Sequence, residues 1–478
     1  MDRFTGKKLV ILGLARQGSA LARFAVQAGA TVVVSDLGKP EQLQGIMADL
    51  SALPIEFVLG SHPTSLLDGT DFLAISGGVP NDIPLVKTAR ERGIIITNDS
   101  LEFMKRTPAS VIGITGSAGK TTTTALTGAM GQAAKRQTWV GGNIGRPLIS
   151  ELTNILPDDM VVQELSSFQL EIWDQSPAIA AVTNITPNHL DRHKTMTAYR
   201  EAKANILRFQ TAQDTAVLCA DDTGAMALES LVNGRLRQFS ILKPVTDGAF
   251  LRDDTIWLAD GAGDVTAVCT LADIQLRGQH NILNVCAAVT LAATVGIPIP
   301  AMVTAIRTFT GVDHRLEEVA TINGVEFIND SIATAPERAL AAINAFSEPL
   351  ILLAGGKDKA MVWETWAQHV QERVKTVILF GALADLLAEK LAAAIEHKGL
   401  LQKIIRVDNL AQAVAVAMET AVAGDIVLLS PGGTSYDAYV DFAARGQEFR
   451  DLVNNLKLLK TKHTNNKEEN SVFSVVSK

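Results

Sequence analysis

A glycine-rich turn in the first third of the chain has the residues needed to hold a phosphate. The stretch "GITGSAGKTTTT" places Gly116 and Gly119 directly before Lys120 and Thr121. Glycines let the backbone approach an anion closely, a lysine can reach β- and γ-phosphates, and a threonine hydroxyl can bind magnesium. A typical P-loop also has a glycine five positions before Gly119, where this chain has Ile114. The turn therefore predicts a shortened phosphate-binding loop.

The segments on either side of this turn support the same interpretation. The apolar run "SVIGI" comes before the turn and predicts a buried strand, and a helical pattern starts at Lys120. The N–H groups and the dipole at the start of a helix attract an anion. A glycine turn with an incidental lysine is the alternative, and the strand–loop–helix order favours the phosphate site. The residues expected at the phosphates are Gly116, Ser117, Ala118, Gly119, Lys120, Thr121 and Thr122.

Side chains that could hold divalent cations follow two other apolar runs. Glu164 ends the strand-like "DMVVQE", where a carboxylate can complete the shell of a phosphate-bound magnesium. A buried acid is costly unless it is paired or bound to a metal, which favours a metal role over a solvated one. His189, in "NITPNHLDRH", is a candidate ligand for a second cation. Lys203 lies in the helical stretch "AYREAKANIL" and by itself indicates a solvated surface lysine.

A second glycine-rich turn, "GLARQG" from Gly13 to Gly18, lies near the N-terminus. It approximates a dinucleotide-binding fingerprint, with Ala15 at the position of the middle glycine and Asp36 at the end of the next strand. Two interpretations of these residues are equally open. The turn binds NAD, or it holds another nucleotide by its diphosphate at the start of the helix.

Short apolar runs alternate with helical patterns along nearly the whole chain, which predicts parallel sheets in an α/β fold. At about 150 residues per domain, a chain of 478 residues predicts roughly three domains. The expected domains are residues 1–105, 106–311 and 312–462, followed by a polar, frayed tail at 463–478. Residues 237–276 are less periodic and predict a small β-rich insertion.

The composition argues against several classes of protein. A net charge of −8 argues against general affinity for nucleic acid or for an anionic membrane. The three cysteines have no paired spacing, which argues against a disulfide framework and fits a reducing compartment. No apolar run reaches the ~18 residues needed to span a bilayer, and no signal-peptide pattern is present. We therefore expect a soluble, monomeric, cytoplasmic protein with no nucleic-acid or membrane partner.

Taken together, these motifs resemble those of a known family. From about residue 6 to residue 460 the chain resembles the Mur ligases, ATP-dependent enzymes that form amide bonds. The stretches that carry the resemblance are "TGSAGKTT", "GGNIG", "ELSSFQLE", "NITPNHLDRH", "YREAKANIL", "GQHNILN", "DHRLE", "INDSIAT", "GGKDK" and "LSPGGTSYDAY". Their common order is far more specific than any one of them. The resemblance implies a Rossmann-like N-terminal domain for a UDP-linked substrate, a central P-loop domain, and a Rossmann-like C-terminal domain for the acceptor amino acid.

The resemblance also implies a reaction. "ELSSFQLE" and "SPGGTSYD" are most similar to members that add D-glutamate to UDP-N-acetylmuramoyl-L-alanine in peptidoglycan precursor synthesis. In such members ATP converts the substrate carboxylate into an acyl phosphate, and the amine of glutamate then displaces phosphate. Two magnesium ions and a lysine neutralise the charge that gathers between ATP and the carboxylate. The implied partners are ATP, glutamate and UDP-N-acetylmuramoyl-L-alanine.

Matching positions imply the roles of individual residues at the reaction centre. By resemblance the catalytic residues are Lys120, His189 and Lys203. The implied metal ligands are Thr121, Glu164, His189 and Lys203, with Lys203 carbamylated so that it resembles a carboxylate. This role replaces the solvated-surface interpretation of Lys203.

The resemblance also assigns the binding contacts of the three substrates. The remaining ATP contacts are Asn281, Asn284, Arg315 and Asp330, the last two from a third domain that swings on a hinge near Gly311. The contacts of the UDP-linked substrate are Ala15, Arg16, Asp36, Gly78 and Asn143, which decides the first turn in favour of UDP. The acceptor contacts are Thr334, Lys359, Ser435, Tyr436 and Phe442.

The acceptor loops depart from the family pattern. The usual N-D-S-K-A-T reads "NDSIAT" here, so Ile332 replaces a lysine and cannot bind a carboxylate or a phosphate. "SPGGTSYD" differs from the commoner "SPACASWD", and Lys357 is a candidate substitute cation. These departures leave L-glutamate open as an alternative acceptor.

Three other functions fit the sequence less well. A folylpolyglutamate-synthase-like ligase shares the central and third domains but lacks a first domain such as residues 1–105. A nucleotide-sugar-binding regulator has no need of the activating set Lys120, Glu164, His189 and Lys203. An NAD-dependent oxidoreductase requires NAD at the first turn.

Overall fold

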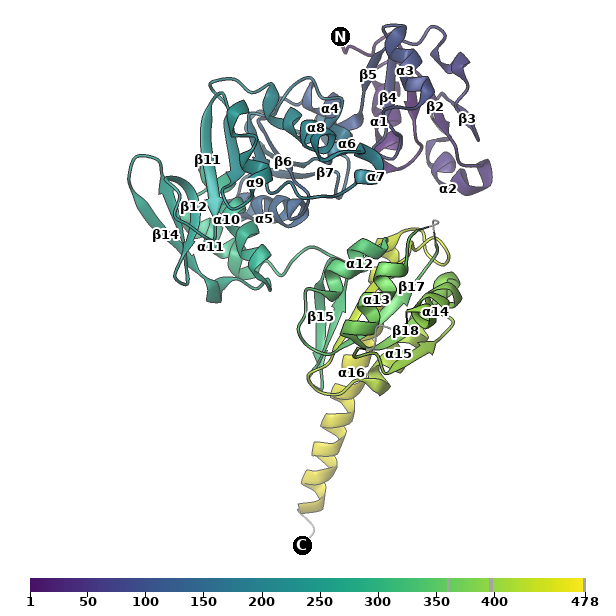
Figure 1. The fold of residues 1–478 in the computed structure, drawn as a ribbon, viewed down its shortest axis with the longest axis vertical. Helices are drawn as coiled ribbons and strands as arrows, with labels where there is room; N and C mark the ends of the chain where they lie inside the picture. The colour runs from purple at the N-terminus through teal and green to yellow at the C-terminus, as the bar shows by residue number, and fades with distance from the viewer. Residues whose placement is uncertain (359–360, 395–398, 476–478) are drawn as a thin grey trace. The chain divides into compact units, whose positions relative to one another are not determined.

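A computed structural model describes residues 1–358, 361–394 and 399–475. Contacts within the chain divide it into two compact units, Met1–Phe309 and Thr310–Lys478, which are described separately. The first unit contains two sheets and the second contains one (Figure 1). The predicted acceptor residue Lys359 lies outside the described residues.

The first sheet is parallel throughout, with the strand order β3-β2-β1-β4-β5. Its strands are β1 (Lys8–Leu12), β2 (Thr31–Asp36), β3 (Ile55–Leu59), β4 (Phe72–Ile75) and β5 (Ile95–Thr97). Its helices are α1 (Arg16–Gln27), α2 (Pro40–Leu50), α3 (Pro84–Glu91) and α4 (Asp99–Met104). The order reverses between β1 and β4, and open α/β sheets bind ligands beyond the carboxyl ends of strands at such a point. The turns after β1 and β4 meet there, where Ser76 Oγ donates to Gly13 O at 3.2 Å.

The second sheet has nine strands in the order β14-β13-β12-β11-β10-β9-β6-β8-β7. Its strands are β6 (Val111–Thr115), β7 (Thr138–Gly142), β8 (Met160–Glu164), β9 (Ile179–Val182), β10 (Thr215–Cys219), β11 (Arg235–Ser240), β12 (Asp247–Arg252), β13 (Thr255–Asp260) and β14 (Val265–Thr270). The associated helices are α5 (Lys120–Ala133), α6 (Ser167–Leu170), α7 (Leu190–His193), α8 (Met196–Arg208), α9 (Thr223–Met226), α10 (Gln279–Thr294) and α11 (Ile299–Thr308).

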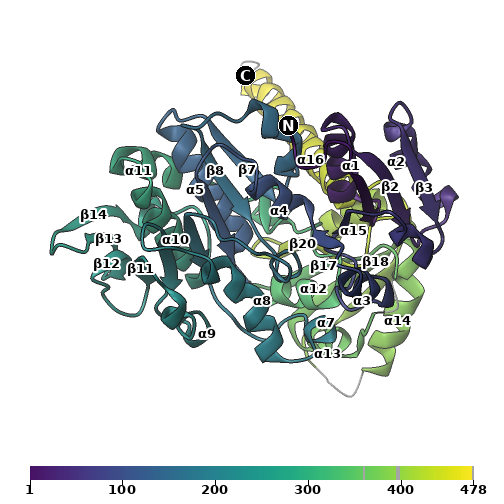
Figure 2. The same ribbon diagram turned by 90° about the horizontal axis from the view of Figure 1, so that it is seen from above.

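The less periodic residues 237–276 are β-rich, as the sequence predicted, but they extend the central sheet instead of forming a separate insertion. Strand β12 pairs parallel with β11, and β13 and β14 continue as antiparallel strands. They form one edge of the sheet, beside β11, in Figure 2. Antiparallel strands are joined by short turns and need no helix between them. The alternation of strand and helix patterns in the sequence is therefore weaker here than in the parallel parts of the chain.

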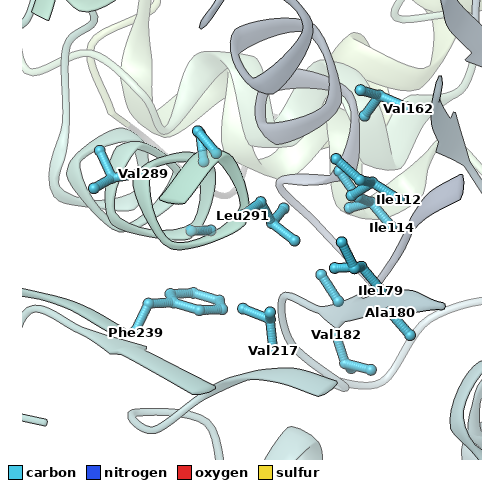
Figure 3. Packing of buried hydrophobic residues seen from close by; sticks show 14 of the residues in the cluster. Ile112, Ile114, Val162, Ile179, Ala180, Val182, Val217, Phe239, Val289 and Leu291 are labelled. Carbon is cyan, nitrogen blue, oxygen red and sulfur yellow. The ribbon is translucent and has the colours of Figure 1, made fainter. Parts of the chain in front are cut away.

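The core under the second sheet fixes the strands that end at the phosphate loop. Apolar side chains of β6, β8, β9 and β10 share one core with those of α10, and Figure 3 shows Ile114, Val217 and Leu291 in this core. These side chains are at most 1% exposed. Burying side chains of this size stabilises the fold by about 1.5–3 kcal/mol each. The ends of β6, β8 and β9 are therefore held rigidly relative to one another.

The second unit contains a six-stranded sheet with the order β15-β16-β20-β17-β18-β19, in which β15 and β16 pair antiparallel and the other pairs are parallel. Its strands are β15 (Glu317–Ile322), β16 (Val325–Asn329), β17 (Leu350–Gly355), β18 (Val374–Phe380), β19 (Lys403–Arg406) and β20 (Ile426–Gly432). Its helices are α12 (Pro336–Ile343), α13 (Glu364–Arg373), α14 (Ala384–Ala393), α15 (Leu410–Thr420) and α16 (Phe442–Val475). The alternating α/β pattern predicted from the sequence is confirmed in all three sheets.

The C-terminal helix differs from the sequence prediction. Instead of fraying from residue 463, α16 continues to Val475. The chain has neither glycine nor proline after Gly446, so no residue there interrupts the helical backbone. Among the described residues, no helix combines the length and apolar character needed to cross a bilayer.

Candidate active site

The phosphate loop lies between β6 and α5, as the sequence predicted, and both of its glycines are required by close packing. Gly119 caps α5 in the left-handed region, at φ 81°. A Cβ atom there would overlap the Asn284 side chain, and one on Gly116 would overlap the Thr183 hydroxyl. The loop therefore packs against the end of β9 and against α10. An alanine at either position would have to move one of these neighbours.

Some amides of the loop are used to hold the loop itself. Ser117 N donates to Asn184 O at 2.9 Å, and Ala118 N donates to Asn184 Oδ1 at 2.8 Å. The Ser117 hydroxyl lies 2.9 Å from the Tyr199 hydroxyl. Donors for an anion therefore come mainly from the first turn of α5, whose N–H groups have no acceptor within the helix. Sequence reasoning did not identify Asn184 as a binding partner of the loop, because an asparagine after a strand is common in turns.

Lys120 lies across the loop. Its ammonium donates to Gly116 O at 2.8 Å and to Ser117 O at 3.1 Å. These two carbonyls hold the positive charge over the loop that the sequence assigned to phosphate. The cation is therefore placed beside the expected anion before any ligand enters.

Lys203 is buried, and the prediction of a solvated surface lysine is wrong. Its side chain on α8 is 1% exposed, and Nζ donates to Gly116 O at 2.8 Å and to Thr115 Oγ1 at 3.2 Å. Burial lowers the pKa of the ammonium well below its ordinary value, the nearby Lys120 lowers it further, and Glu164 opposes the shift. A neutral amine, which is a nucleophile, is thus favoured beside the phosphate loop.

Glu164 ends β8, as predicted, and is 1% exposed. Its Oε1 accepts a hydrogen bond from Asn143 Nδ2 at 2.8 Å. Among the described residues, the buried Oε2 has no hydrogen-bond partner. A buried carboxylate oxygen of this kind is costly unless a cation or a donor completes its surroundings. The residue therefore fits the metal role inferred from its position.

His189 stands at the start of the short helix α7 in the left-handed region, at φ 53°. Its ring packs edge-on against Phe168, with 5.0 Å between the ring centroids. In the part of the chain that the structure describes, no cluster of three or more His, Cys, Asp or Glu side chains could hold a metal. Of the four predicted ligands only Glu164 and His189 are of these types, so such a site would need Thr121, Lys203 or a substrate as well.

The N-terminal end of α10 completes the surroundings of the phosphate loop. Asn284 Nδ2 donates to Asn281 Oδ1 at 3.0 Å, and Asn284 Oδ1 lies 3.5 Å from the Thr123 hydroxyl. The two predicted nucleotide contacts on α10 are thus joined to each other and to α5. Arg315 and Asp330, the other two, belong to the second unit.

Hydrogen bonds connect some of the predicted contacts of the UDP-linked substrate with Glu164. Asp36 accepts from the Leu14 and Gly38 amides, both at 2.7 Å, and so braces the first glycine-rich turn. Arg16, which follows Ala15 at the start of α1, donates to Asn143 O at 3.4 Å. Because Asn143 also binds Glu164, the structure connects this turn to the carboxylate beside the phosphate loop. Gly78 lies in the turn after β4, and its carbonyl accepts from Arg192 at 3.4 Å.

In the second unit, the predicted acceptor residues lie on loops that follow β16 and β20. Ser435 is buried, Tyr436 is exposed, and Thr334 is half-buried, two residues after the half-buried Ile332. Phe442 starts α16, and its carbonyl accepts from the Ser331 hydroxyl at 2.8 Å.

The sequence did not identify the residue that joins these two loops. Arg445 on α16 is completely buried, and it donates to Ser331 Oγ at 3.0 Å, to Ser331 O at 2.9 Å and to Gly433 O at 3.2 Å. Burial lowers the pKa of its guanidinium to about 10, so the group stays charged at neutral pH. Only the packing of α16 against the loops distinguishes Arg445 from the surface arginines of such a helix.

Three family models match consecutive parts of the chain. The model described as "Mur ligase MurD-like, N-terminal domain" matches residues 7–98, "Mur ligase middle domain" matches residues 114–292, and "Mur ligase, glutamate ligase domain" matches residues 314–433.

Curated proteins and solved structures agree with these matches. The chain is 40% identical over 455 residues to the UDP-N-acetylmuramoylalanine–D-glutamate ligase of Pelotomaculum thermopropionicum, covering 95% of this chain and 99% of the relative. It is 41% identical over 449 residues to the ligase of the same name from Symbiobacterium thermophilum, covering 94% and 98%.

Among solved structures, UDP-N-acetylmuramate–alanine ligase MurC of Thermotoga maritima has a TM-score of 0.58 at 19% identity, covering 94% of this chain and 99% of the other. MurF ligase of Thermotoga maritima, solved in complex with ADP, has a TM-score of 0.52 at 16% identity, covering 95% and 98%. These two likenesses show the common fold alone. Together with the shortened phosphate loop, the three matched domains and relatives about 40% identical over nearly the whole chain show that this chain belongs to the Mur ligase family.

Proposed function

We propose that this Mur ligase joins D-glutamate to UDP-N-acetylmuramoyl-L-alanine, with consumption of ATP, in the synthesis of peptidoglycan precursors. Relatives named for D-glutamate ligation match the chain over nearly its full length. The structural observation that carries the proposal is the pair formed by Glu164 and Lys203 beside the phosphate loop. One has a buried oxygen without a hydrogen-bond partner among the described residues, and the other is a buried amine whose pKa is strongly lowered.

The reaction requires activation, because a carboxylate does not react with an amine in neutral water. An oxygen of the substrate carboxylate attacks the γ-phosphorus of ATP, the bond from that phosphorus to the bridging oxygen breaks, and ADP leaves. The deprotonated amine of glutamate then attacks the carbonyl carbon of the acyl phosphate, phosphate leaves with the electrons of the broken C–O bond, and the new amide nitrogen loses a proton to water. Lys120 and the first-turn amides of α5 hold the transferred phosphoryl group and stabilise its developing charge.

Two magnesium ions fit the donors that the site offers. Magnesium, when bound, acts as a Lewis acid that neutralises phosphate and carboxylate charge. Glu164 and Thr121 would hold one ion, and His189 with Lys203 would hold the other. The unpartnered Oε2 of Glu164 is the observation that supports this assignment.

Lys203 becomes a suitable ligand when it is carbamylated. Its neutral amine attacks the carbon of CO2, a new N–C bond forms, and a proton leaves to water, so that a carboxylate replaces a cation. Burial favours the neutral amine that this step requires. The Thr115 hydroxyl and the Gly116 carbonyl fix the position of Nζ.

The three domains divide the substrates among them. Residues 1–105 bind the UDP-linked substrate through Ala15, Arg16, Asp36 and Gly78, and residues 106–311 bind ATP and place Asn143 between the two. Residues 312–462 bind glutamate through Thr334, Lys359, Ser435, Tyr436 and Phe442, while Arg315 and Asp330 close over ATP by movement near Gly311. We also propose that the enzyme is monomeric and that it acts in the cytoplasm. The second of these proposals rests on its substrates, which are nucleotides and an amino acid.

The acceptor configuration is tested directly. Phosphate release from the purified protein is measured with ATP and UDP-N-acetylmuramoyl-L-alanine, with either D- or L-glutamate. We expect release with D-glutamate and little with L-glutamate. The reverse preference would show that the Ile332 loop selects the other enantiomer, and release with neither would contradict the proposed function.

A further inference from the structure

Arg192 connects the turn after β4 to the helix that carries the candidate metal ligand His189. Its guanidinium donates to Gly78 O at 3.4 Å and to Val79 O at 3.3 Å. Both carbonyls belong to the turn that we assign to the UDP-linked substrate. The arginine itself lies on α7, three residues after His189. One side chain thus joins a turn of the first sheet to a helix associated with the second sheet.

The same guanidinium covers the aromatic ring of Phe168. This ring packs against His193 in α7 and against His189, the residue that caps α7. Arg192 Cζ lies 4.3 Å from the centroid of the Phe168 ring. The ring of Phe168 stacks on that of His193, with 5.1 Å between centroids and an angle of 4° between planes. It also meets His189 edge-on at 5.0 Å. A planar guanidinium stacks on an aromatic face as well as attracting it electrostatically, which a lysine ammonium cannot do.

The segment that carries His189 needs such support from outside. His189 and Lys194, at the two ends of the four-residue α7, both have left-handed backbones, with φ of 53° and 64°. Residues with a Cβ seldom adopt this conformation without contacts that enforce it. The stack of Arg192, Phe168 and His193 provides contacts of that kind.

We propose that Arg192 is a positioning residue through which the UDP-linked substrate, bound at the turn after β4, sets the position of His189 and so strengthens nucleotide binding. This inference rests on the proposed function, which places the UDP-linked substrate at Gly78 and the second metal ion at His189. A substrate that immobilises the turn also fixes the two carbonyls that hold the guanidinium. The guanidinium in turn fixes Phe168, and Phe168 fixes the histidine ring. Such coupling is reciprocal, so the nucleotide strengthens substrate binding by the same factor.

The surroundings of Arg192 tolerate a change without collapse of the core. The side chain is half-buried, and it lines a cavity of about 510 Å³ whose wall also includes Asp82 and Glu171. Because this wall is polar, water can replace lost atoms. Arg192→Lys and Phe168→Leu are therefore expected to fold.

Arg90 offers a matched control. It holds the same turn, since it donates to Asn81 O at 3.0 Å and also to the Asn81 side chain. Among the residues that the structure describes, the cation–π contacts do not include Arg90. Arg90→Lys therefore loosens the turn without touching the stack.

The experiment measures the affinity of a magnesium-bound, non-hydrolysable ATP analogue by calorimetry, with and without saturating UDP-N-acetylmuramoyl-L-alanine and without glutamate. In the protein without substitutions we expect bound substrate to increase the affinity for the analogue by about 5–10-fold, within the usual range of coupling between two ligands. Arg192→Lys and Phe168→Leu should each reduce this factor to below about twofold. The double variant should show no further loss. Arg90→Lys should keep the factor of the unmodified protein.

Either of two results with the variants would overturn the inference. Arg192→Lys could keep the original factor, or Arg90→Lys could lose it equally, which would assign the coupling to the turn and not to the stack. Steady-state kinetics separates these results from failure of the proposed function. An unmodified protein that turns over but shows no coupling refutes only the role of Arg192. A protein that fails to bind UDP-N-acetylmuramoyl-L-alanine refutes both.

Discussion

Glu164 in the first unit and Asp330 in the second are both buried acids at the carboxyl ends of strands, but their surroundings differ. Asp330 Oδ1 accepts from the Leu316 amide at 3.3 Å, and Oδ2 accepts from the Ser430 hydroxyl at 2.9 Å. Glu164 has one donor, Asn143, and its Oε2 has no hydrogen-bond partner among the described residues. Groups of the protein itself satisfy both oxygens of Asp330, whereas among the described residues they satisfy one oxygen of Glu164. A buried acid at a strand end therefore indicates a metal site only when its oxygens are unsatisfied.

The buried cations of the two units differ in the same way. Lys203 is held by a carbonyl and a hydroxyl, and burial lowers the pKa of its ammonium well below the ordinary value, which favours the neutral amine. Arg445 remains charged and uses three nitrogens to join two loops. The first unit thus buries groups that can react, and the second buries a group that holds loops in place.

The largest effect is expected for Lys120→Ala, which removes the cation over the phosphate loop. We expect kcat to fall by about 10³-fold, because a preorganised charge on the transferred group is lost. Binding of UDP-N-acetylmuramoyl-L-alanine should change by less than twofold, since the ammonium of Lys120 donates to carbonyls of the phosphate loop, which we assign to ATP. Phosphate release and calorimetry measure the two quantities.

The exposed Lys87 on α3 provides the control for this substitution, and Lys87→Ala should leave both quantities unchanged. Substantial ADP formation by Lys120→Ala would show that another cation holds the transferred phosphate. The comparison between reactive and supporting groups would then have to be redrawn.

Glu164→Gln tests whether the carboxylate oxygen that has no hydrogen-bond partner among the described residues binds a cation. We expect kcat/KM for ATP to fall by about 10²-fold, because a metal ligand loses its charge. Without ligands, the variant should be as stable as the original or more stable, since a buried charge becomes neutral. Thermal unfolding in the presence of a chelator measures the second effect. A loss of more than about 2 kcal/mol would mean that the carboxylate supports the fold instead.

The sequence predicted the parts of the site that local patterns determine. Strand–turn–helix order identified Lys120, and the position at the end of an apolar strand identified Glu164. Lys203 could not be derived in this way, because a helical pattern does not show that α8 packs against β6 and the loop after it. The same reason hid Arg445 and Arg192, because Ser331 and Gly78, to which they donate, each lie 114 residues away along the chain. Such contacts depend on tertiary packing, which only the resemblance to a family could anticipate for Lys203.

Arg445→Met tests the supporting role of the buried arginine in the second unit. Methionine has a similar length but leaves the Ser331 and Gly433 carbonyls without their donor, so we expect a loss of about 3 kcal/mol in the stability of this unit. Denaturant unfolding, followed by hydrogen exchange of peptides from residues 310–475, measures it. Binding of the ATP analogue by the first unit should stay within twofold. Unchanged exchange in the Ser331 and Gly433 loops would contradict the role.

Asp330→Asn should have the smallest effect, and its sign follows from the direction of the pKa shift. Burial raises the pKa of Asp330 to about 7 from 3.8, so the folded state binds more protons than the unfolded state between these values. The contribution of this group to stability is present below pH 4 and is lost as the pH rises towards 7. Asparagine removes this dependence, and we expect it to raise the stability of the second unit at pH 7 by about 1–2 kcal/mol, since lost charge-assisted hydrogen bonds offset part of the gain.

Asp99 separates this effect from a general response of the chain to pH. Burial also raises its pKa to about 7, but it lies in the first unit. Asp99→Asn should therefore flatten the pH dependence of hydrogen exchange between pH 4 and 7 only in residues 1–309, and Asp330→Asn only in residues 310–475. A change that spread through both units in either variant would show that their stabilities are coupled. Glu164 and Asp330 could then no longer be treated as acids of two independent environments.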